Sequence, residues 1–310
     1  MISVFAGVAM SRLTANLLLL VAAIVWGAAF VAQSTAMDNI GPLAFTGIRF
    51  LLGALAVAPF AYWEWKRSPN PIPAKGHYQG IFVGVIFFIA TIIQQYGFLT
   101  TTVTNAGFLT ALYVILTPLL SLILFRQAPN PIIWVIVTIS LTGTYLLAGG
   151  LNGLVEGDLL MIASALFWAL QILLLGRLVS TYGNPLSVAF LQFLTSGIIG
   201  LVLGLMLEPL STQNIVGAWK ELLYAGFMSV GLAFTLQAIA QRYTAPSDAA
   251  ILLSTESLFA ALFGALILGE TLTGDQWLGC AMIFSSILLV ELLPQFQKFI
   301  KSKKLAEQNN

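Results

Sequence analysis

Residues 251–263 read Ile-Leu-Leu-Ser-Thr-Glu-Ser-Leu-Phe-Ala-Ala-Leu-Phe and hold a single carboxylate, Glu256, in an otherwise apolar run. The run belongs to a segment near 247–268, and a helix needs about 20 apolar residues to cross a hydrocarbon layer roughly 30 Å thick. A charge in such a segment is costly, and it usually faces the interior of a bundle or a cavity. The stretch therefore predicts a membrane-spanning helix that carries an acid on its protein-facing side.

The composition of the whole chain also indicates a membrane environment. Of the 310 residues, 8% are charged and 59% are hydrophobic, and the formal net charge is +1. Soluble proteins carry about 25% charged residues, so most of this surface is expected to face lipid. The near-neutral charge argues against a nucleic-acid partner. A single Cys280 and a single His77 supply no disulfide and no Cys or His metal site, so we expect no metal, no cofactor and no catalytic residue.

Ten apolar stretches are long enough to span a membrane. They lie near 13–33, 42–63, 79–99, 103–125, 131–149, 157–177, 184–206, 219–240, 247–268 and 275–293. The predicted fold class is an all-α integral membrane protein with ten transmembrane helices. The first stretch is longer than the apolar core of a signal peptide, which has about 7–15 residues, so we expect it to remain in the protein.

Lysine and arginine predict how the spans are oriented. With the N-terminus inside, the inner connections and the tail Lys298–Lys304 hold 11 of the 13 Lys and Arg residues. Positive charge concentrates on the cytoplasmic side of membrane proteins. Ten spans with both termini in the cytoplasm of a bacterial inner membrane satisfy this rule.

Residues of the first half align with residues about 143 positions later in the second half, and we call this spacing the repeat offset. Aligned pairs include Trp26 with Trp168, Pro42 with Pro185, Gln94 with Gln237 and Trp134 with Trp277. Each half has five spans, an odd number, so the second half must enter the membrane upside down. Inverted-topology repeats are typical of secondary transporters, whose substrate sites lie near the midplane. We predict one five-helix repeat in 1–150 and a second, with the basic cytoplasmic tail, in 151–310.

Three short motifs resemble those of EamA-type transporters in the drug/metabolite transporter superfamily. They are Trp26-Gly-Ala-Ala-Phe30, Ile48-Arg49-Phe50 and Leu268-Gly269-Glu270. The resemblance covers the chain in two halves, although Arg126-Gln127 stands where the first half would have a Gly-Glu pair. It implies a central cavity lined mainly by spans one, three, four, six, eight and nine. It also implies export of metabolites or amino acids.

Glu256 is the main functional candidate. Ala249, Ala260 and Gly264 share its helical face, and small residues mark the side on which membrane helices pack together. Glu256 is therefore expected to point into the bundle near the midplane. We favour a cation ligand or proton carrier over a purely structural hydrogen bond. Its counterpart in the first half is Tyr113, so only one half supplies a carboxylate.

The other candidates are neutral groups and one arginine. We expect the substrate cavity to be lined by Trp26, Gln94, Gln95, Tyr96, Tyr113, Trp168, Gln171, Gln237 and Glu256. Interhelical hydrogen bonding and core packing are the alternatives for the neutral residues. We expect Arg49 to face protein, and we favour a structural or gating role over an anion-binding one, because a long side chain can also extend to the nearby interface.

These features predict a secondary transporter that exports a small organic solute by alternating access. The chain has no Walker A motif, so ATP is not expected to drive it directly. A flippase for lipid or lipid-linked sugar is the first alternative, and it would show a lateral apolar opening. A membrane-embedded enzyme is the second, although acid–base residues do not cluster in the sequence. The expected partners are a small-molecule substrate and membrane lipids, and a homodimer and a monomer fit equally well.

Overall fold

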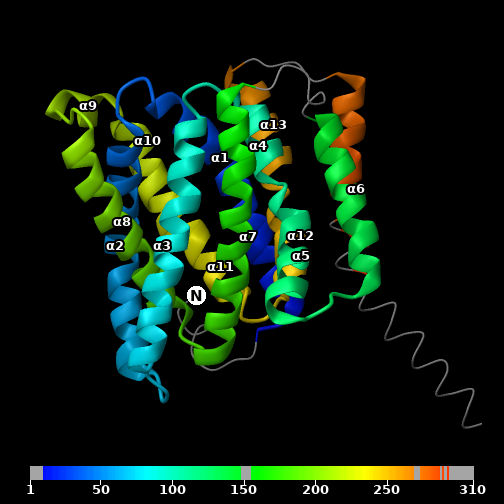
Figure 1. Cartoon of the computed structure of the whole chain (residues 1–310), viewed down its shortest axis with the longest axis horizontal. Coiled ribbons are helices and arrows are strands. Elements are labelled where there is room, and N and C mark those ends of the chain that lie inside the picture. The colour runs from blue at the N-terminus through cyan, green and yellow to red at the C-terminus, as the bar shows by residue number, and fades with distance from the viewer. Residues whose placement is uncertain (1–9, 148–154, 269–272, 287, 290–291, 293–310) are drawn as a thin grey trace, which may run out of the picture.

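The computed structural model describes residues 10–147, 155–268, 273–286, 288–289 and 292. Within these residues the chain consists of helices joined by turns and short connections, with no strand. Figure 1 shows the long helices running side by side along one common direction. The fold described is therefore an all-helical bundle.

In the described part of the chain, eight units are long and apolar enough to cross a membrane, and they lie at eight of the ten predicted positions. They are α1 (Arg12–Ala36), α2 (Pro42–Arg67), α3 (Ala74–Gly97), α4 with α5 (Val103–Thr110 and Tyr113–Phe125), α7 (Glu156–Tyr182), α8 (Pro185–Leu207), α10 with η2 and α11 (Trp219–Leu223, Tyr224–Phe234 and Thr235–Ala240), and α12 with α13 (Pro246–Leu253 and Glu256–Leu268).

The two remaining predicted spans are described less completely. The fifth corresponds to α6 (Pro131–Leu147), an apolar helix shorter than the other eight. The tenth is helical over 274–286, but part of it, and the whole tail Lys298–Lys304, lie outside the described residues. The structure also contains a short helix that the sequence did not predict, α9 (Thr212–Gly217), between α8 and α10.

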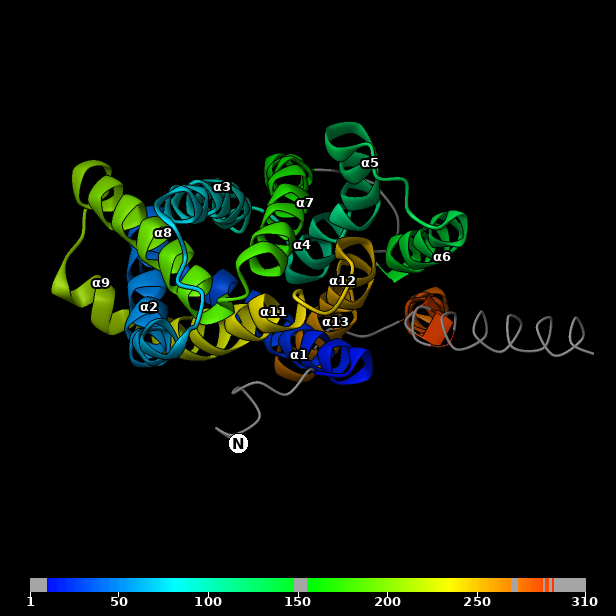
Figure 2. The ribbon, with the colours of Figure 1, turned by 90° about the horizontal axis from the view of Figure 1, so that it is seen from below.

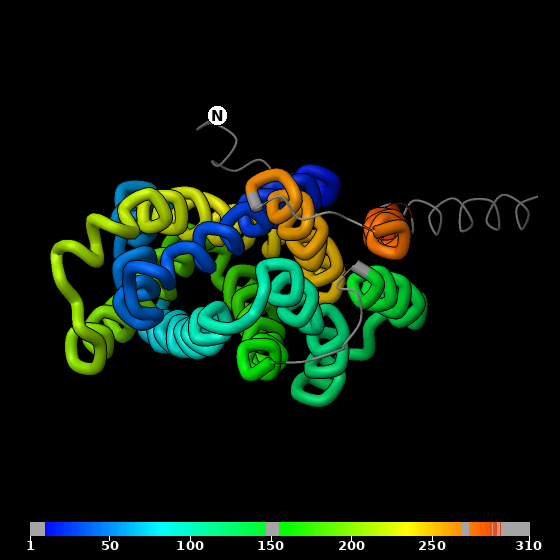
Figure 3. The backbone as a smooth tube through the Cα atoms, turned by 90° about the horizontal axis from the view of Figure 1, so that it is seen from above, coloured from blue at the N-terminus to red at the C-terminus, as the bar shows by residue number. Residues whose placement is uncertain are grey.

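The helices form two layers when the bundle is viewed from either end (Figures 2 and 3). One layer contains α8, α3, α7, α4 with α5, and α6. The other contains α2, η2 with α11, α1, α12 with α13, and the helix at 274–286. Each layer therefore combines helices from both halves of the chain.

Glycines bring α2 and α8 into close contact across the two layers. A Cβ atom added to Gly47 of α2 would lie 2.2 Å from the backbone nitrogen of Leu201. On α8, a Cβ on Gly200 would meet the nitrogen of Gly47 at 2.8 Å, and one on Gly204 would meet that of Ala44 at 2.8 Å. Small residues let membrane helices approach until their backbones touch, and this pair depends on them.

The same two helices cap each other through carboxylates. Glu208, directly after α8, accepts hydrogen bonds from the N–H groups of Leu43 (2.9 Å) and Ala44 (2.8 Å) in the first turn of α2. Glu64, near the end of α2, accepts bonds from the N–H and hydroxyl of Ser187 (2.7 and 2.8 Å) in the first turn of α8. The first N–H groups of a helix lack intrahelical partners, so each carboxylate satisfies donors of the opposite helix.

Two spans are interrupted near their middle. Residues 111–112 separate α4 from α5, and residues 254–255 separate α12 from α13. Neither break contains glycine or proline. The interruptions make Tyr113 the first residue of α5 and Glu256 the first residue of α13. Half-helices that begin inside the bundle are a common way to build transporter binding sites.

Candidate functional site

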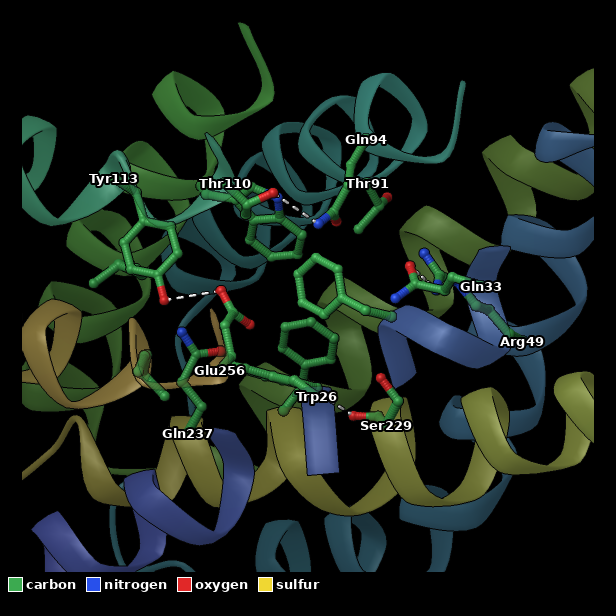
Figure 4. A pocket seen from close by; sticks show the side chains of 15 residues that line it. Trp26, Gln33, Arg49, Thr91, Gln94, Thr110, Tyr113, Ser229, Gln237 and Glu256 are labelled. Atoms are coloured by element: carbon green, nitrogen blue, oxygen red, sulfur yellow. Dashed lines mark hydrogen bonds between the residues drawn. The ribbon is translucent and has the colours of Figure 1, made fainter. Parts of the chain in front are cut away.

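A cavity lies between the two layers (Figure 4), where about 460 Å³ of space, open solvent included, is free of protein atoms. Its 15 lining residues come from α1, α2, α3, α4 with α5, α7, η2 with α11, and α12 with α13. The family resemblance implied six of these seven units. The seventh, α2, contributes Arg49.

Most of the lining consists of residues at corresponding positions in the two halves. Six pairs are related by the repeat offset to within one position: Trp26 and Trp168, Phe30 and Ile172, Thr91 and Phe234, Gln94 and Gln237, Thr110 and Leu253, and Tyr113 and Glu256. The three other lining residues are Gln33, Arg49 and Ser229. The cavity is therefore shared almost equally by the two halves.

Tyr113 and Glu256 face each other at the two helix breaks (Figure 4). The Tyr113 hydroxyl donates a hydrogen bond of 3.0 Å to Oε1 of Glu256. Tyr113 is 3% exposed and Glu256 is 5% exposed. Glu256 also begins α13, where the partial positive charge of a helix N-terminus favours a carboxylate. This arrangement can hold a cation or exchange a proton at one acid.

Aromatic side chains form a wall of the cavity. The rings of Trp168 and Phe234 are stacked, with centroids 5.7 Å apart and an interplanar angle of 4°, and Trp26 lies 4.3 Å from Phe234. Nε1 of Trp26 donates to the carbonyl of Ser229 at 3.3 Å. Nε1 of Trp168 has no hydrogen-bond partner among the described residues. The wall presents flat apolar faces, and it contains one buried donor that is unpaired among the described residues.

Glutamine amides supply the neutral polar groups. Nε2 of Gln237 donates to Oε1 of Gln171, and Nε2 of Gln171 donates to Oε1 of Gln192, each at 3.2 Å. In the other half, Nε2 of Gln94 donates to Oγ1 of Thr110 at 3.2 Å. Oε1 of Gln237 has no partner within the described part of the chain. A ligand in the cavity therefore meets both donors and acceptors.

Arg49 lies in the cavity wall and is 3% exposed. Its Nη1 donates to Oε1 of Gln33 at 2.6 Å. Its guanidinium carbon lies 5.1 Å from the ring centroid of Phe45 and 5.2 Å from that of Phe50. The side chain is thus directed into the protein, as its helical face suggested, and it does not extend to the nearby interface.

Comparison with known proteins identifies the family. The EamA-like transporter family matches residues 13–149 and again 155–292. The chain belongs to the EamA-like transporter family. An uncharacterized transporter from Archaeoglobus fulgidus is 32% identical over 91% of this chain and 87% of its own length. YicL of Salmonella typhimurium, named as an uncharacterized inner membrane transporter, is 24% identical over 88% of this chain and 93% of its own.

A solved structure has a similar fold. One crystal structure of another protein matches this chain with a TM-score of 0.73 at 19% identity. The match covers 91% of this chain and 98% of the other. This EamA-family chain is a multi-pass membrane protein, and its family and relatives are transporters.

Three predicted cavity residues lie outside the lining of this EamA-family cavity. Gln95 is buried behind it, where its Nε2 donates to the carbonyl of Gln33 at 3.1 Å. Tyr96 is 38% exposed on the outer side of α3. Successive residues of a helix point about 100° apart, so only Gln94 of this triplet faces the cavity. Gln171 lies behind Gln237 and accepts a hydrogen bond from it. The other six predicted residues line the cavity.

Eight lining residues besides Arg49 were not predicted from the sequence. They are Phe30, Gln33, Thr91, Thr110, Ile172, Ser229, Phe234 and Leu253. Phe30 and Gln33 follow Trp26 at helical spacing, and the repeat offset leads from Phe30 to Ile172, so a signal for these three was present. Thr91 precedes Gln94 by three positions, so helical spacing gave a signal for it too, and its hydroxyl bonds to the carbonyl of Phe87 at 2.9 Å, as many membrane threonines do.

Proposed function

We propose that this EamA-family chain is a secondary transporter that exports small organic solutes, such as amino acids or related metabolites, from a bacterial cell. The main support is the cavity lining, in which six pairs of corresponding residues surround one space between the layers. A site shared by two similar halves can open to either side of a membrane by equivalent motions. Transport by alternating access around this cavity is the function that the geometry favours.

We also propose that the halves 1–150 and 151–310 are inverted five-helix repeats, with ten spans and both termini in the cytoplasm. In the two layers, α8 packs against α2, and Figure 2 shows α3 opposite η2 with α11, and α7 opposite α1. The reciprocal caps by Glu64 and Glu208 are what a twofold axis in the membrane plane would produce. Inner-membrane relatives such as YicL support the proposed location.

Glu256 is the proposed coupling residue. It is a buried carboxylate that faces the cavity at a helix break, and Tyr113 supplies its hydrogen bond. Intramembrane acids commonly carry protons or bind cations in transporters. The alternative is a structural role in which Glu256 only joins α13 to α5.

Two steps test this proposal. Cells that express the protein are first screened for tolerance to amino acids and related metabolites, and a solute that they export is reconstituted in proteoliposomes. Glu256→Gln is then expected to abolish the dependence of transport on an imposed pH gradient, whereas Asp38→Asn, an exposed acid, leaves it intact. Unchanged transport and pH dependence in Glu256→Gln would exclude the coupling role.

The cavity lining also bears on the alternatives. A lipid flippase would need an apolar path for acyl chains, whereas Gln94, Gln237 and Glu256 make this lining partly polar. A membrane-embedded enzyme is disfavoured by the transporter names of the relatives. We therefore propose a small-molecule substrate and a surrounding lipid bilayer as the partners, with either a monomer or a homodimer.

A further inference from the structure

We infer that Arg49, supported by Gln33, forms a subsite that binds a carboxylate group of the transported solute. The inference rests on the proposed transport function and assigns one chemical feature of the substrate. Three observations carry it: the state of the guanidinium, the residue at the corresponding position in the other half, and the surfaces next to it.

The guanidinium of Arg49 is buried with few of its donors satisfied. One bond, from Nη1 to Gln33, is formed, and Nε has no hydrogen-bond partner among the described residues. No carboxylate of the described chain lies within salt-bridge distance of it. A buried cation without a counter-ion is costly, and guanidinium has five N–H donors to satisfy. A ligand anion in the cavity would supply both the charge and the acceptors.

The second half shows that the fold does not require a charge at this position. Gln192, which the repeat offset pairs with Arg49, is fully buried and accepts a hydrogen bond from Gln171 at 3.2 Å. A neutral amide therefore fills the corresponding site on α8 and joins it to the neighbouring helix. Arg49 joins α2 to α1 through Gln33 in a similar way, but it adds a positive charge. The extra charge points to a ligand.

The position of Arg49 in the cavity defines the kind of anion. Figure 4 shows Arg49 and Glu256 at opposite ends, with aromatic rings between them. Glu256 is thus not placed to neutralise Arg49. A guanidinium fork matches the planar oxygens of a carboxylate, and Trp26 and Phe30 offer apolar faces beside it. The subsite suits a carboxylate on a flat apolar body.

Benzoate and benzamide are matched probes for this subsite, since they share a ring and differ in charge. Binding is measured as quenching of tryptophan fluorescence in the purified full-length protein in detergent, because Trp26 and Trp168 line the cavity. We expect benzoate to bind at least about tenfold more tightly than benzamide, as for hydrogen bonds to a charged group. Arg49→Gln should remove the difference, and Arg49→Lys should keep part of it.

The variant and its control follow from the structure. Arg49→Gln copies the residue found at the corresponding position, so it is expected to fold, and a thermal melt checks this. Arg177→Gln removes an exposed arginine and should leave the preference for benzoate unchanged.

Equal binding of the two probes by the unmodified protein, or no benzoate binding at about 10 mM, would overturn the inference. A preference that survives in Arg49→Gln would do so too. Because this is an equilibrium measurement, failure of the transport assays would leave its result standing, so the two proposals fail separately.

Discussion

Glu256 combines a position at the start of a half-helix with a partner from the opposite half of the chain. Its carboxylate accepts the Tyr113 hydroxyl at 3.0 Å while both side chains stay buried. An acid held in this way has a defined orientation toward the cavity. The hydroxyl therefore contributes to the geometry of the site as well as to the contact between α5 and α13.

Tyr113→Phe should separate these two contributions. Loss of one interhelical hydrogen bond is expected to lower the free energy of unfolding by about 0.6 kcal/mol, which a denaturant titration in detergent measures. The transport rate should fall further than this small loss of stability explains, because the carboxylate is no longer oriented. Tyr145→Phe, on an exposed tyrosine, serves as the control. Wild-type transport by Tyr113→Phe would show that the hydroxyl does not orient Glu256.

Trp168 allows a ring and its donor to be tested separately. Its indole stacks on Phe234, and its Nε1 is unpaired among the described residues. Trp168→Phe should keep the stacking and fold normally, but it should weaken solute binding by the value of one hydrogen bond, about 1 kcal/mol. Trp168→Ala should cost about 3–5 kcal/mol of stability. Thermal unfolding and equilibrium binding distinguish the two effects, and equal binding by Trp168→Phe and wild type would remove the donor from the site.

At the scale of single residues, physical reasons explain which cavity residues the sequence predicted and which it did not. Glu256 and Tyr113 stood out because an acid in an apolar run is expensive and because the repeat offset pairs them. Tyr96 was grouped with Gln94 because the two are close in sequence, although they point to different sides of α3. Ser229 gave no signal, because it reaches the cavity from a π-helix whose register differs from that of an α-helix.

The elements that position the site are α2 and α8, and their caps can be tested directly. Glu64→Ala and Glu208→Ala should each lower stability by about 1 kcal/mol, the usual cost of losing a helix N-cap. The two sites lie at opposite ends of helices that are about 35 Å long, so the double variant should show additive losses. Thermal unfolding of the four proteins measures this. A large excess loss in the double variant would contradict the view that each cap acts locally.

Close packing of the same helices makes a second prediction. Gly47→Ala would place a Cβ atom 2.2 Å from a backbone nitrogen of α8, and backbone cannot move aside as a flexible side chain can. We expect a loss of about 1–3 kcal/mol from overpacking and a low yield of folded protein, measured by size-exclusion chromatography and thermal unfolding. Gly274→Ala is the matched control, since a Cβ there meets nothing within 4 Å. Normal stability of Gly47→Ala would contradict the close approach.

The sequence predicted elements better than their interruptions. Apolar length determines where a helix can span, so eight predicted positions correspond to helices of spanning length. The breaks at 111–112 and 254–255 carry no glycine or proline, and hydropathy does not report them.

At the scale of the whole molecule, corresponding contacts hold the two ends of the bundle. At one end, the Thr244 hydroxyl donates to Asn16 at 3.0 Å, and Arg12 pairs with Asp248 at 2.8 Å. At the other end, Thr101, the counterpart of Thr244 in the first half, donates to Asp158. At each end, a connection between two spans is thus hydrogen-bonded to residues near the start of another span. Among these contacts, only the pair of Arg12 and Asp248 is an ion pair.

Asp248→Asn should favour opening at the end that contains Arg12, proposed here to be the cytoplasmic end. A partly exposed ion pair is worth at most about 1 kcal/mol, so the open population should rise by up to about fivefold. With Cys280→Ser as background, a cysteine at Ser229 in the cavity is labelled by an impermeant maleimide in inside-out vesicles. Faster labelling is the expected result, and Arg177→Gln is the control. Slower or unchanged labelling would show that the ion pair does not hold this end closed.

For the molecule as a whole, the most informative property of the sequence was the alignment between its two halves. The repeat offset, which aligns Trp26 with Trp168, also pairs other residues that line the same cavity. It could not predict Arg49 and Gln33 as lining residues, because neither has a lining counterpart. Lining residues outside the symmetry need another signal, such as the helical spacing that relates Gln33 to Trp26.

The joined pair of α2 and α8 has a practical consequence for measuring motion. Sliding one helix along the other would break carboxylate bonds at both ends and drive glycine backbones together. A pair of spectroscopic labels at Leu55 and Leu205, both exposed, should therefore report a constant separation throughout the transport cycle. That constant separation would serve as an internal reference distance. Displacements of α5, α12 and α13 could be measured against it in the same sample.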